Sequence, residues 1–259
     1  MQSYPGSILE VTVREDRPVA VLTLNAPPLN IVTMATRHHL RAAFEEIEAR
    51  EDIRAVVIRS QGEHFTSGGD ITAFLEASPE ELSHLAEAVA APERCSKPVI
   101  ARLTGYTFGV GLEIALACDF RIASPTTVLA LPELRLGMIP GSGGTQRVAR
   151  LAGLGRAKDM ILRARRIGAE EAYQWGLLTE VVPAESLDQR VEELLDELLA
   201  FSPLAFKACK EALNESQEGP LQQGLKLEGR LYGFLRTSED FAEGVRAFKE
   251  KRKPRFQGK

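Results

Sequence analysis

The sequence predicts an α/β fold, and two features of the hydrophobic pattern carry that prediction. Over the first two thirds of the chain, short β-branched and apolar runs alternate with segments that have apolar residues at helical spacing. From residue 169 onward the pattern is helical. Strands that alternate with helices favour parallel pairing through right-handed crossovers. We therefore expect a core that holds the active site at 1–195 and a helical C-terminal region at 196–259.

The N-terminal elements are predicted to be a hairpin, a helix and two buried strands. Alternating segments at 8–13 and 19–24 flank a polar turn and predict the hairpin. Thr33 suits the N-cap of a helix that runs to about residue 50. Short apolar strands are expected at 54–59 and 99–103, with a helix over 78–91 between them.

Four helices are expected toward the C-terminus. Leucine and valine recur at helical spacing over 187–200, and Pro203 fits the first turn of a helix that reaches residue 213. Two further helices are predicted at 221–234 and 239–249.

Composition places the chain among ordinary globular proteins. Its 259 residues are 44% hydrophobic and 26% charged, which allows a large buried core. The formal net charge of −4 disfavours a general nucleic-acid or anionic-membrane surface. A basic run at 249–255 is interpreted either as a solvated tail or as a set of phosphate contacts.

Targeting and metal signals are lacking. The N-terminus has no secretory pattern, and no run of about 18 apolar residues occurs, so we expect a cytoplasmic protein. Cys95, Cys118 and Cys209 are widely separated and are expected to be reduced, packed side chains. The four histidines show no ligand spacing, so no metal site is expected.

Three glycine-rich segments point to chemistry. The first, Ser67-Gly68-Gly69-Asp70, follows a predicted strand. Paired glycines there let the backbone approach a ligand closely, and Asp70 can orient or cap the turn. An ordinary strand-to-helix turn is the alternative interpretation of this segment.

The other two segments each place a glutamate in apolar surroundings. In Gly109-Val110-Gly111-Leu112-Glu113, a turn opens a helix whose first N–H groups suit an oxyanion. Glu133 lies beside apolar Leu131 and Leu134, ahead of a glycine-rich run that includes Gly141. Because ionised glutamates are rarely buried without a partner, the two indicate an acid/base pair that faces a ligand.

Nucleotide-binding motifs fit these segments poorly. Ile114 occupies the third small position of a dinucleotide fingerprint, and no Lys followed by Ser or Thr completes a phosphate-binding loop after Gly144. Met138 and Ile139 are expected to be packing residues.

Together the order and spacing of the segments resemble the crotonase (enoyl-CoA hydratase/isomerase) superfamily over essentially the full length, and most closely its two-glutamate hydratases. The matching stretches are residues 22–25, 65–71, 105–113, 118–123, 132–146, 176–182 and 241–254.

The resemblance implies a fold and a substrate. The fold is a spiral of ββα units with a helical C-terminal region that forms trimers or dimers of trimers. The substrate is an acyl-CoA thioester whose oxygen accepts hydrogen bonds from the N–H groups of Gly69 and Val110. The family usually has glycine where Val110 stands, so the valine is expected to narrow the acyl space. No cofactor beyond the substrate's coenzyme A, no nucleic acid and no membrane partner is implied.

The resemblance also implies the reaction. Glu113 and Glu133 would hold the water that adds across the 2,3 double bond to give a 3-hydroxyacyl-CoA, a hydro-lyase reaction of fatty acid or acyl-CoA metabolism. Gly141 would help to position that water. Further substrate-binding positions are Ser67, Gly68, Asp70, Ile71 and Thr72. Lys249 and Lys251 are candidates for contacts with the coenzyme A phosphates.

Two alternatives remain open. The same fold can run another acyl-CoA reaction, namely double-bond isomerisation, ring hydrolysis or retro-aldol cleavage. A non-catalytic or RNA-binding member of the family is the second, although both glutamates and the acidic charge balance disfavour it.

Overall fold

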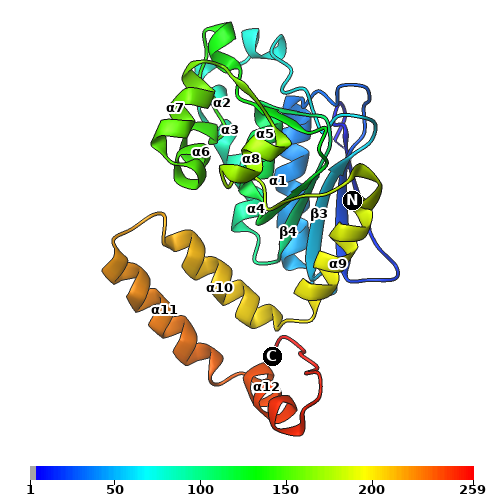
Figure 1. The fold of residues 1–259 in the computed structure, drawn as a ribbon, viewed down its shortest axis with the longest axis vertical. Helices are drawn as coiled ribbons and strands as arrows, with labels where there is room; N and C mark the ends of the chain where they lie inside the picture. The colour runs from blue at the N-terminus through cyan, green and yellow to red at the C-terminus, as the bar shows by residue number, and fades with distance from the viewer. Residues whose placement is uncertain (1–3) are drawn as a thin grey trace. The chain divides into compact units, whose positions relative to one another are not determined.

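The computed structural model describes residues 4–259, which form two compact units (Figure 1). The first unit comprises the chain up to Cys95 together with Val99–Val191. The second comprises Ser96–Pro98 and Glu192–Lys259. The predicted division at residue 195 falls just beyond this boundary, inside helix α9 (Leu187–Leu199).

A six-stranded sheet in the order β1-β2-β3-β4-β6-β9 forms the centre of the first unit. The predicted hairpin is confirmed, because β1 and β2 are antiparallel. Each later neighbour pair is parallel, as the strand–helix alternation predicts. The strands span Leu9–Val13, Val19–Leu24, Ala55–Ser60, Val99–Leu103, Phe120–Ala123 and Glu180–Val181.

A smaller sheet brings the glycine-rich segments together. It contains β5 (Tyr106–Phe108), β7 (Val128–Ala130) and β8 (Arg166–Gly168) in that order. An isolated bridge joins Thr66 to Thr107 on β5, and a second joins Gly69 to Val32. The turn after β3 is thereby fixed between β5 and the segment that leads into the first helix.

The helices of the first unit surround this frame. α1 (Met34–Ala49) begins after Thr33, whose hydroxyl accepts a hydrogen bond from Thr36 N at 3.1 Å, which confirms the predicted cap. α5 is fully buried, and α6 and α7 lie on its side away from β3 and β4 (Figure 1). Bounds of the remaining elements are α5 Val110–Ala117, α6 Gly144–Ala152, α7 Leu154–Leu162, α8 Ala169–Gln174, and the 3-10 turns η1 Ala73–Leu75, η2 Glu133–Leu136 and η3 Ala184–Ser186.

Two predictions about secondary structure are wrong in detail. The single helix expected over 78–91 is three short helices, α2 (Pro79–Ser83), α3 (Leu85–Val89) and α4 (Ala91–Arg94). Pro92, just beyond the predicted segment, has no N–H, and its ring would clash with the carbonyl of Ala88, which accounts for the break between α3 and α4. The break between α2 and α3 at His84 has no such cause. The helical pattern after residue 169 also conceals β9, which at two residues is too short to show alternation.

The second unit is helical, as predicted. It contains α10 (Pro203–Glu215), α11 (Leu221–Leu235) and α12 (Glu239–Glu250) after the end of α9. Cys209 is exposed on α10, so the prediction of three packed cysteines holds only for Cys95 and Cys118. The helix turns its neighbours Ala208 and Lys210 inward instead.

The second unit also exposes large apolar side chains. Tyr232 and Phe248 are 78% and 85% exposed, and no residue of α11 is buried. Leu213, Leu221, Leu225, Phe234 and Phe241 add to this apolar surface. No helix among residues 4–259 is long and apolar enough to cross a membrane.

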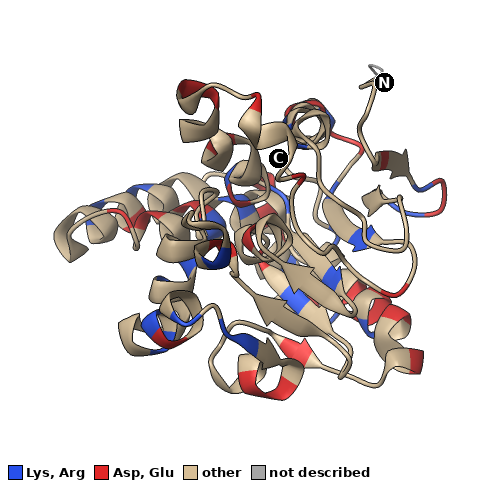
Figure 2. Cartoon of the chain, turned by 90° about the horizontal axis from the view of Figure 1, so that it is seen from above, with Lys and Arg blue, Asp and Glu red and all other residues tan. Residues whose placement is uncertain are grey.

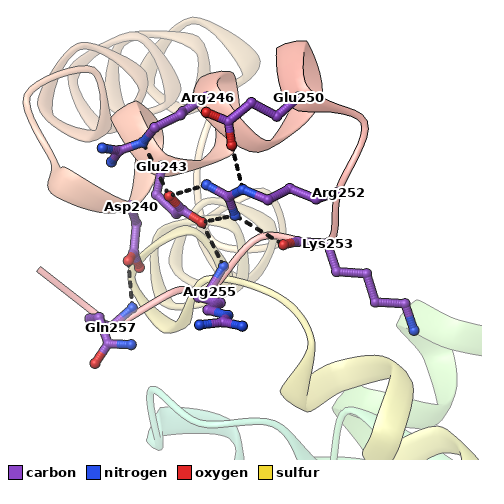
Figure 3. Close-up of polar contacts among 8 residues, drawn as sticks. All are labelled: Asp240, Glu243, Arg246, Glu250, Arg252, Lys253, Arg255 and Gln257. Carbon is purple, nitrogen blue, oxygen red and sulfur yellow. Dashed lines mark hydrogen bonds and ion pairs between the residues drawn. The ribbon is translucent and has the colours of Figure 1, made fainter.

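The C-terminal basic run is folded back onto α12 (Figure 3). Arg252 makes a two-pronged ion pair with Glu243, at 2.6 and 3.0 Å, and the Arg255 N–H donates to the same carboxylate at 2.9 Å. The Arg252 guanidinium lowers the pKa of Glu243 to about 2. Lys249 and Lys251 remain exposed. Elsewhere acidic and basic residues are interspersed along the helices (Figure 2).

Candidate active site

Glu113 is a buried carboxylate held by a backbone loop. It lies in the first turn of α5 and is 2% exposed. Its Oε1 accepts hydrogen bonds from the N–H groups of Ser142 at 2.8 Å and Gly144 at 2.9 Å. A Cβ on Gly144 would stand 3.0 Å from this oxygen, so the loop approaches closely only because residue 144 is glycine. Both donors fix the orientation of Glu113.

Glu133 is the second carboxylate, at the start of η2. Its Oε1 lies 3.0 Å from the position of a Cβ on Gly109, and Oε2 is buried with no hydrogen-bond partner in residues 4–259. Burial raises the pKa of Glu133 to about 7. The charge of Glu113 contributes to this rise, whereas the backbone N–H of Glu133 itself and the charge of Arg37 oppose it. A carboxyl group with this pKa can accept and return a proton near neutral pH.

Two backbone N–H groups beside these carboxylates are free. Val32 N donates to Gly68 O at 2.9 Å and Asp70 N donates to Val32 O at 3.0 Å, so the backbone on either side of Gly69 is fixed. Within the described chain the N–H of Gly69 itself has no partner, and neither does that of Val110. Val110 is the first residue of α5, where helical N–H groups lack intrahelical acceptors. Two unpaired donors suit an oxyanion.

The side chain of Val110 narrows the space beside the two free N–H groups. Its Cγ1 lies 3.7 Å from the position that a Cβ on Gly69 would occupy. The two residues with free N–H groups are therefore neighbours in space.

The remaining predicted positions differ in their surroundings. Asp70 caps its turn, because Oδ1 accepts from Thr72 N at 3.1 Å and from Thr72 Oγ1 at 2.7 Å. Gly68 has φ +125°, a conformation that favours glycine. Ser67 N donates to Leu29 O at 2.9 Å, and Ile71 is half exposed.

The loop after η2 contains the predicted site residue Gly141 and two features that the sequence analysis did not foresee. Gly141 is exposed, and the two N–H groups on Glu113 come from Ser142 and Gly144, which sequence reasoning did not single out. Met138 and Ile139 are 51% and 67% exposed, so the prediction that they are packing residues is wrong. They lie on the surface loop that connects η2 to α6.

Arg37 is a further residue that the sequence analysis missed. It lies in the first turns of α1, is 4% exposed, and donates from Nη1 to Ser142 Oγ at 2.8 Å. Burial lowers its pKa to about 10, and the charges of Glu113 and Glu133 oppose that shift, so it stays cationic at neutral pH. A signal was present, because Arg37 lies three residues before Leu40 on the apolar face of the helix.

These groups define an acid/base site for a polarised carbonyl. Two free N–H groups can stabilise a developing oxyanion, while two carboxylates approach the same region and one of them titrates near neutrality. Among residues 4–259 no group of three histidine, cysteine or acidic side chains is arranged to hold a metal ion. Two free N–H donors together with two carboxylates are the groups with which enzymes form and protonate enolates.

Comparison with known proteins agrees with this chemistry. The family model described as enoyl-CoA hydratase/isomerase matches residues 14–259. The 2,3-dehydroadipyl-CoA hydratase of Escherichia coli is 35% identical, over 96% of this chain and 99% of its own. The short-chain-enoyl-CoA hydratase of Clostridium acetobutylicum is also 35% identical, over 94% and 95%. The crystal structure of an enoyl-CoA hydratase from Bacillus anthracis superposes with a TM-score of 0.90 at 34% identity, over 98% and 100%.

The chain belongs to the enoyl-CoA hydratase/isomerase family. The predicted superfamily and its crotonase fold are confirmed.

Proposed function

We propose that the protein hydrates the 2,3 double bond of an enoyl-CoA thioester to give a 3-hydroxyacyl-CoA. One observation carries the proposal: Glu133 lies against Gly109, next to the free N–H of Val110, and is close enough to Glu113 for the charge of Glu113 to raise its pKa. The curated relatives named as enoyl-CoA hydratases support the same hydro-lyase reaction.

The proposed chemistry divides the work between the two glutamates. Because Oε1 of Glu113 already accepts two N–H groups, its Oε2 is the oxygen that can orient a water. Ionised Glu133 takes a proton from that water as the water oxygen bonds to Cβ. The π electrons move toward the thioester oxygen, which the N–H groups of Gly69 and Val110 stabilise. Glu133 then returns the proton to Cα, so every proton of the added water is accounted for.

The expected magnitudes are large. A positioned proton donor or acceptor typically contributes about 10²–10⁴-fold in rate. Removal of one oxyanion-hole donor typically costs about 10²–10³-fold. The reaction needs no cofactor beyond the coenzyme A of the substrate.

We expect the part of the acyl group next to the reacting double bond to be apolar. Ile71, Met138 and Ile139 belong to the segments that carry Gly69 and Glu133, and each is half or more exposed. Val110 Cγ1, close to Gly69, limits the width of an acyl chain at Cα.

We further propose a cytoplasmic homotrimer or dimer of trimers. The exposed apolar side chains of the second unit, Tyr232 and Phe248 among them, support assembly, because such surfaces are unfavourable in water. Mass photometry of the purified protein should give three or six times the chain mass of 28.4 kDa. A monomer at nanomolar concentration would contradict this assembly.

The reaction is tested with crotonyl-CoA. We expect loss of the conjugated-thioester absorbance and formation of 3-hydroxybutyryl-CoA, with Glu113→Gln and Glu133→Gln each reducing the rate by about 10²–10⁴-fold. The exposed Glu51 provides the matched control, and Glu51→Gln should leave the rate unchanged. No turnover by the wild type would reject a short-chain hydratase. A shifted double bond, a free acid or an aldehyde as product would instead assign one of the other reactions of this fold.

A further inference from the structure

Arg37 is a buried arginine with few polar contacts: one hydrogen bond to Ser142 and the ring of Phe74, whose centroid lies 6.0 Å from its guanidinium carbon. A buried guanidinium loses several kcal/mol of hydration, and proteins normally offset that loss with ion pairs and hydrogen bonds. In residues 4–259, Arg37 has no carboxylate within ion-pair distance, and its Nε is buried without a hydrogen-bond partner. Its single side-chain hydrogen bond is the one to Ser142.

A second buried arginine shows what a structural role requires. Arg121 is 7% exposed, comparable with Arg37. Its Nε donates to Leu177 O at 2.8 Å and its Nη1 donates to Cys118 O at 2.6 Å. Arg121 thus ties backbone carbonyls together and is satisfied by them. Among residues 4–259 the side chain of Arg37 donates to no backbone carbonyl, and the ring of Phe74 at 6.0 Å offers it no hydrogen-bond acceptor in the ring plane, so its Nε stays without a partner.

The contacts of Arg37 lead to the reacting groups. Nη1 donates to Ser142 Oγ at 2.8 Å, and the backbone N–H of the same serine donates to Oε1 of Glu113 at 2.8 Å. Nη2 lies 3.6 Å from the position of a Cβ on Gly69. Arg37 therefore stands between the loop that holds Glu113 and the turn that presents a free N–H group.

The charge of Arg37 also reaches both carboxylates. The titratable groups that act on Glu133 are Glu113 on α5, which opposes its ionisation, and Arg37 on α1, which favours it. Arg135 on η2 itself donates to Ala164 O. The described residues thus offer Glu133 one nearby cation against one nearby anion.

We propose that Arg37 is a positioning residue for the acid/base pair: anchored on Ser142, it holds the loop that orients Glu113 and supplies the positive charge that lets two carboxylates share one site. The inference rests on the proposed hydratase function, and it assigns to a residue on α1 the task of keeping Glu133 ionisable. It requires no direct contact between Arg37 and substrate.

The pH dependence of kcat/KM tests the charge. In Arg37→Met the side chain is similar in length but neutral, so Glu133 faces Glu113 without compensation. We expect the acidic limb of the profile to move by about 1 pH unit to higher pH, since removal of a nearby opposite charge shifts a carboxyl by about that much or more. At pH 7, kcat should fall about 10–100-fold with a smaller change in KM. Arg37→Lys, which retains the charge, should recover most of the shift.

The variant Ser142→Ala separates anchoring from charge. It removes the hydroxyl that accepts from Arg37 but keeps the N–H that binds Glu113 and keeps the cation. We expect a several-fold lower kcat with the acidic limb within about 0.3 pH unit of the wild type, well short of the shift expected for loss of the cation. Arg121→Met is the control for loss of a buried arginine, and it should lower stability without moving the limb.

Two results would overturn the inference. The first is an Arg37→Met profile that coincides with the wild type. The second is a uniform loss of activity at all pH values, equal to that of Arg121→Met. If Arg37→Met does not fold, the neutral Arg37→Gln, whose amide can still donate to Ser142, takes its place, and an acidic limb that coincides with the wild type in that variant would overturn the charge role.

Failure of the proposed function would be recognised separately. If the wild type turns over no enoyl-CoA, the hydratase proposal is wrong, and the role of Arg37 is then tested by urea unfolding. Without the cation, the free energy of unfolding should fall more steeply between pH 5 and pH 8 in Arg37→Met than in the wild type. An equal pH dependence in both proteins would reject the role of Arg37 independently of any activity.

Discussion

Oε1 of Glu133 lies 3.0 Å from the point at which a Cβ on Gly109 would stand. Gly109 has φ +52° and immediately precedes Val110, whose N–H is free at the start of α5. One glycine therefore permits both the turn into the helix and the close approach of the carboxylate. The position of the candidate base and that of a candidate oxyanion donor are coupled through this residue.

The variant Gly109→Ala should damage activity more than stability. Gly109 has φ +52° and ψ −125°, outside the left-handed helical region, so a side chain there costs about 1–3 kcal/mol, and the new methyl group must also displace Glu133. Because a displacement of about 1 Å in a reacting group can cost about 10²-fold, we expect kcat to fall by that order. Steady-state kinetics and urea unfolding measure the two effects.

Gly6 provides a matched control for the backbone strain. It has φ +78°, and a Cβ there would meet only Ala35 Cβ at an ordinary 3.8 Å. Gly6→Ala should lose about 1 kcal/mol of stability and keep full activity. Equal activity in the two variants would show that the approach of Glu133 to Gly109 is not needed for turnover.

The N–H of Val110 can be removed without removal of the helix start. Proline is tolerated at the first position of a helix, where its missing N–H would have no intrahelical acceptor. We expect Val110→Pro to reduce kcat by about 10²–10³-fold through loss of one oxyanion donor. Val110→Gly keeps the N–H and should retain activity, with a shift in preference toward bulkier acyl groups. Circular dichroism of both variants checks that α5 is intact, and comparable kcat values would contradict the oxyanion role.

Periodic and local features of this fold are predictable from sequence. Thr33 as a helix cap, the hairpin before it, and the parallel strands after it follow from hydroxyl placement, alternation and β-branched runs. The turn that presents Gly69 follows from paired glycines. These features depend on a few adjacent residues, so a single sequence contains what is needed to infer them.

Long-range contacts could not be predicted from the sequence, because they join residues that are far apart in the chain. Arg37 meets Ser142 across 105 residues of chain, and no local pattern couples an α1 position to a loop before α6. The N–H groups that orient Glu113 are backbone atoms of Ser142 and Gly144, which side-chain identity does not reveal. β9 is a strand only because β6 offers it an edge. In each case the role of a residue or strand depends on a partner that is distant in the sequence.

The pH–rate profile should report Glu133 directly. Its pKa of about 7 means that the group is protonated below neutrality and ionised above it. Because the proposed base must be ionised to accept a proton from water, kcat/KM should rise with pH, reach half its maximum near pH 7 and level off above about pH 8. Measurement between pH 5 and pH 9 tests this, with Glu133→Gln expected to lack that limb. A wild-type limb near pH 4.5, the ordinary value for glutamate, would contradict the raised pKa.

The same raised pKa makes Glu133 a cost to folded stability at alkaline pH. The folded protein holds this proton up to about pH 7, whereas an unfolded glutamate releases it near pH 4.5. Between those values the native state binds more protons than the unfolded state, so the free energy of unfolding falls as pH rises. After allowance for partial solvent exposure, the cost above pH 7 is about 1–3 kcal/mol. Glu133→Gln carries no charge and avoids it.

We therefore expect Glu133→Gln to be more stable than the wild type at pH 8 by about 1–3 kcal/mol and equally stable near pH 4.5. Urea unfolding at the two pH values measures the difference at fixed protein concentration. Glu113→Gln should behave in the opposite way at pH 8, because its neutral oxygen accepts the Ser142 and Gly144 N–H groups more weakly than the carboxylate does. If Glu133→Gln is less stable than the wild type at both pH values, burial does not raise the pKa of Glu133. Glu133 would then not be the base that titrates near neutral pH.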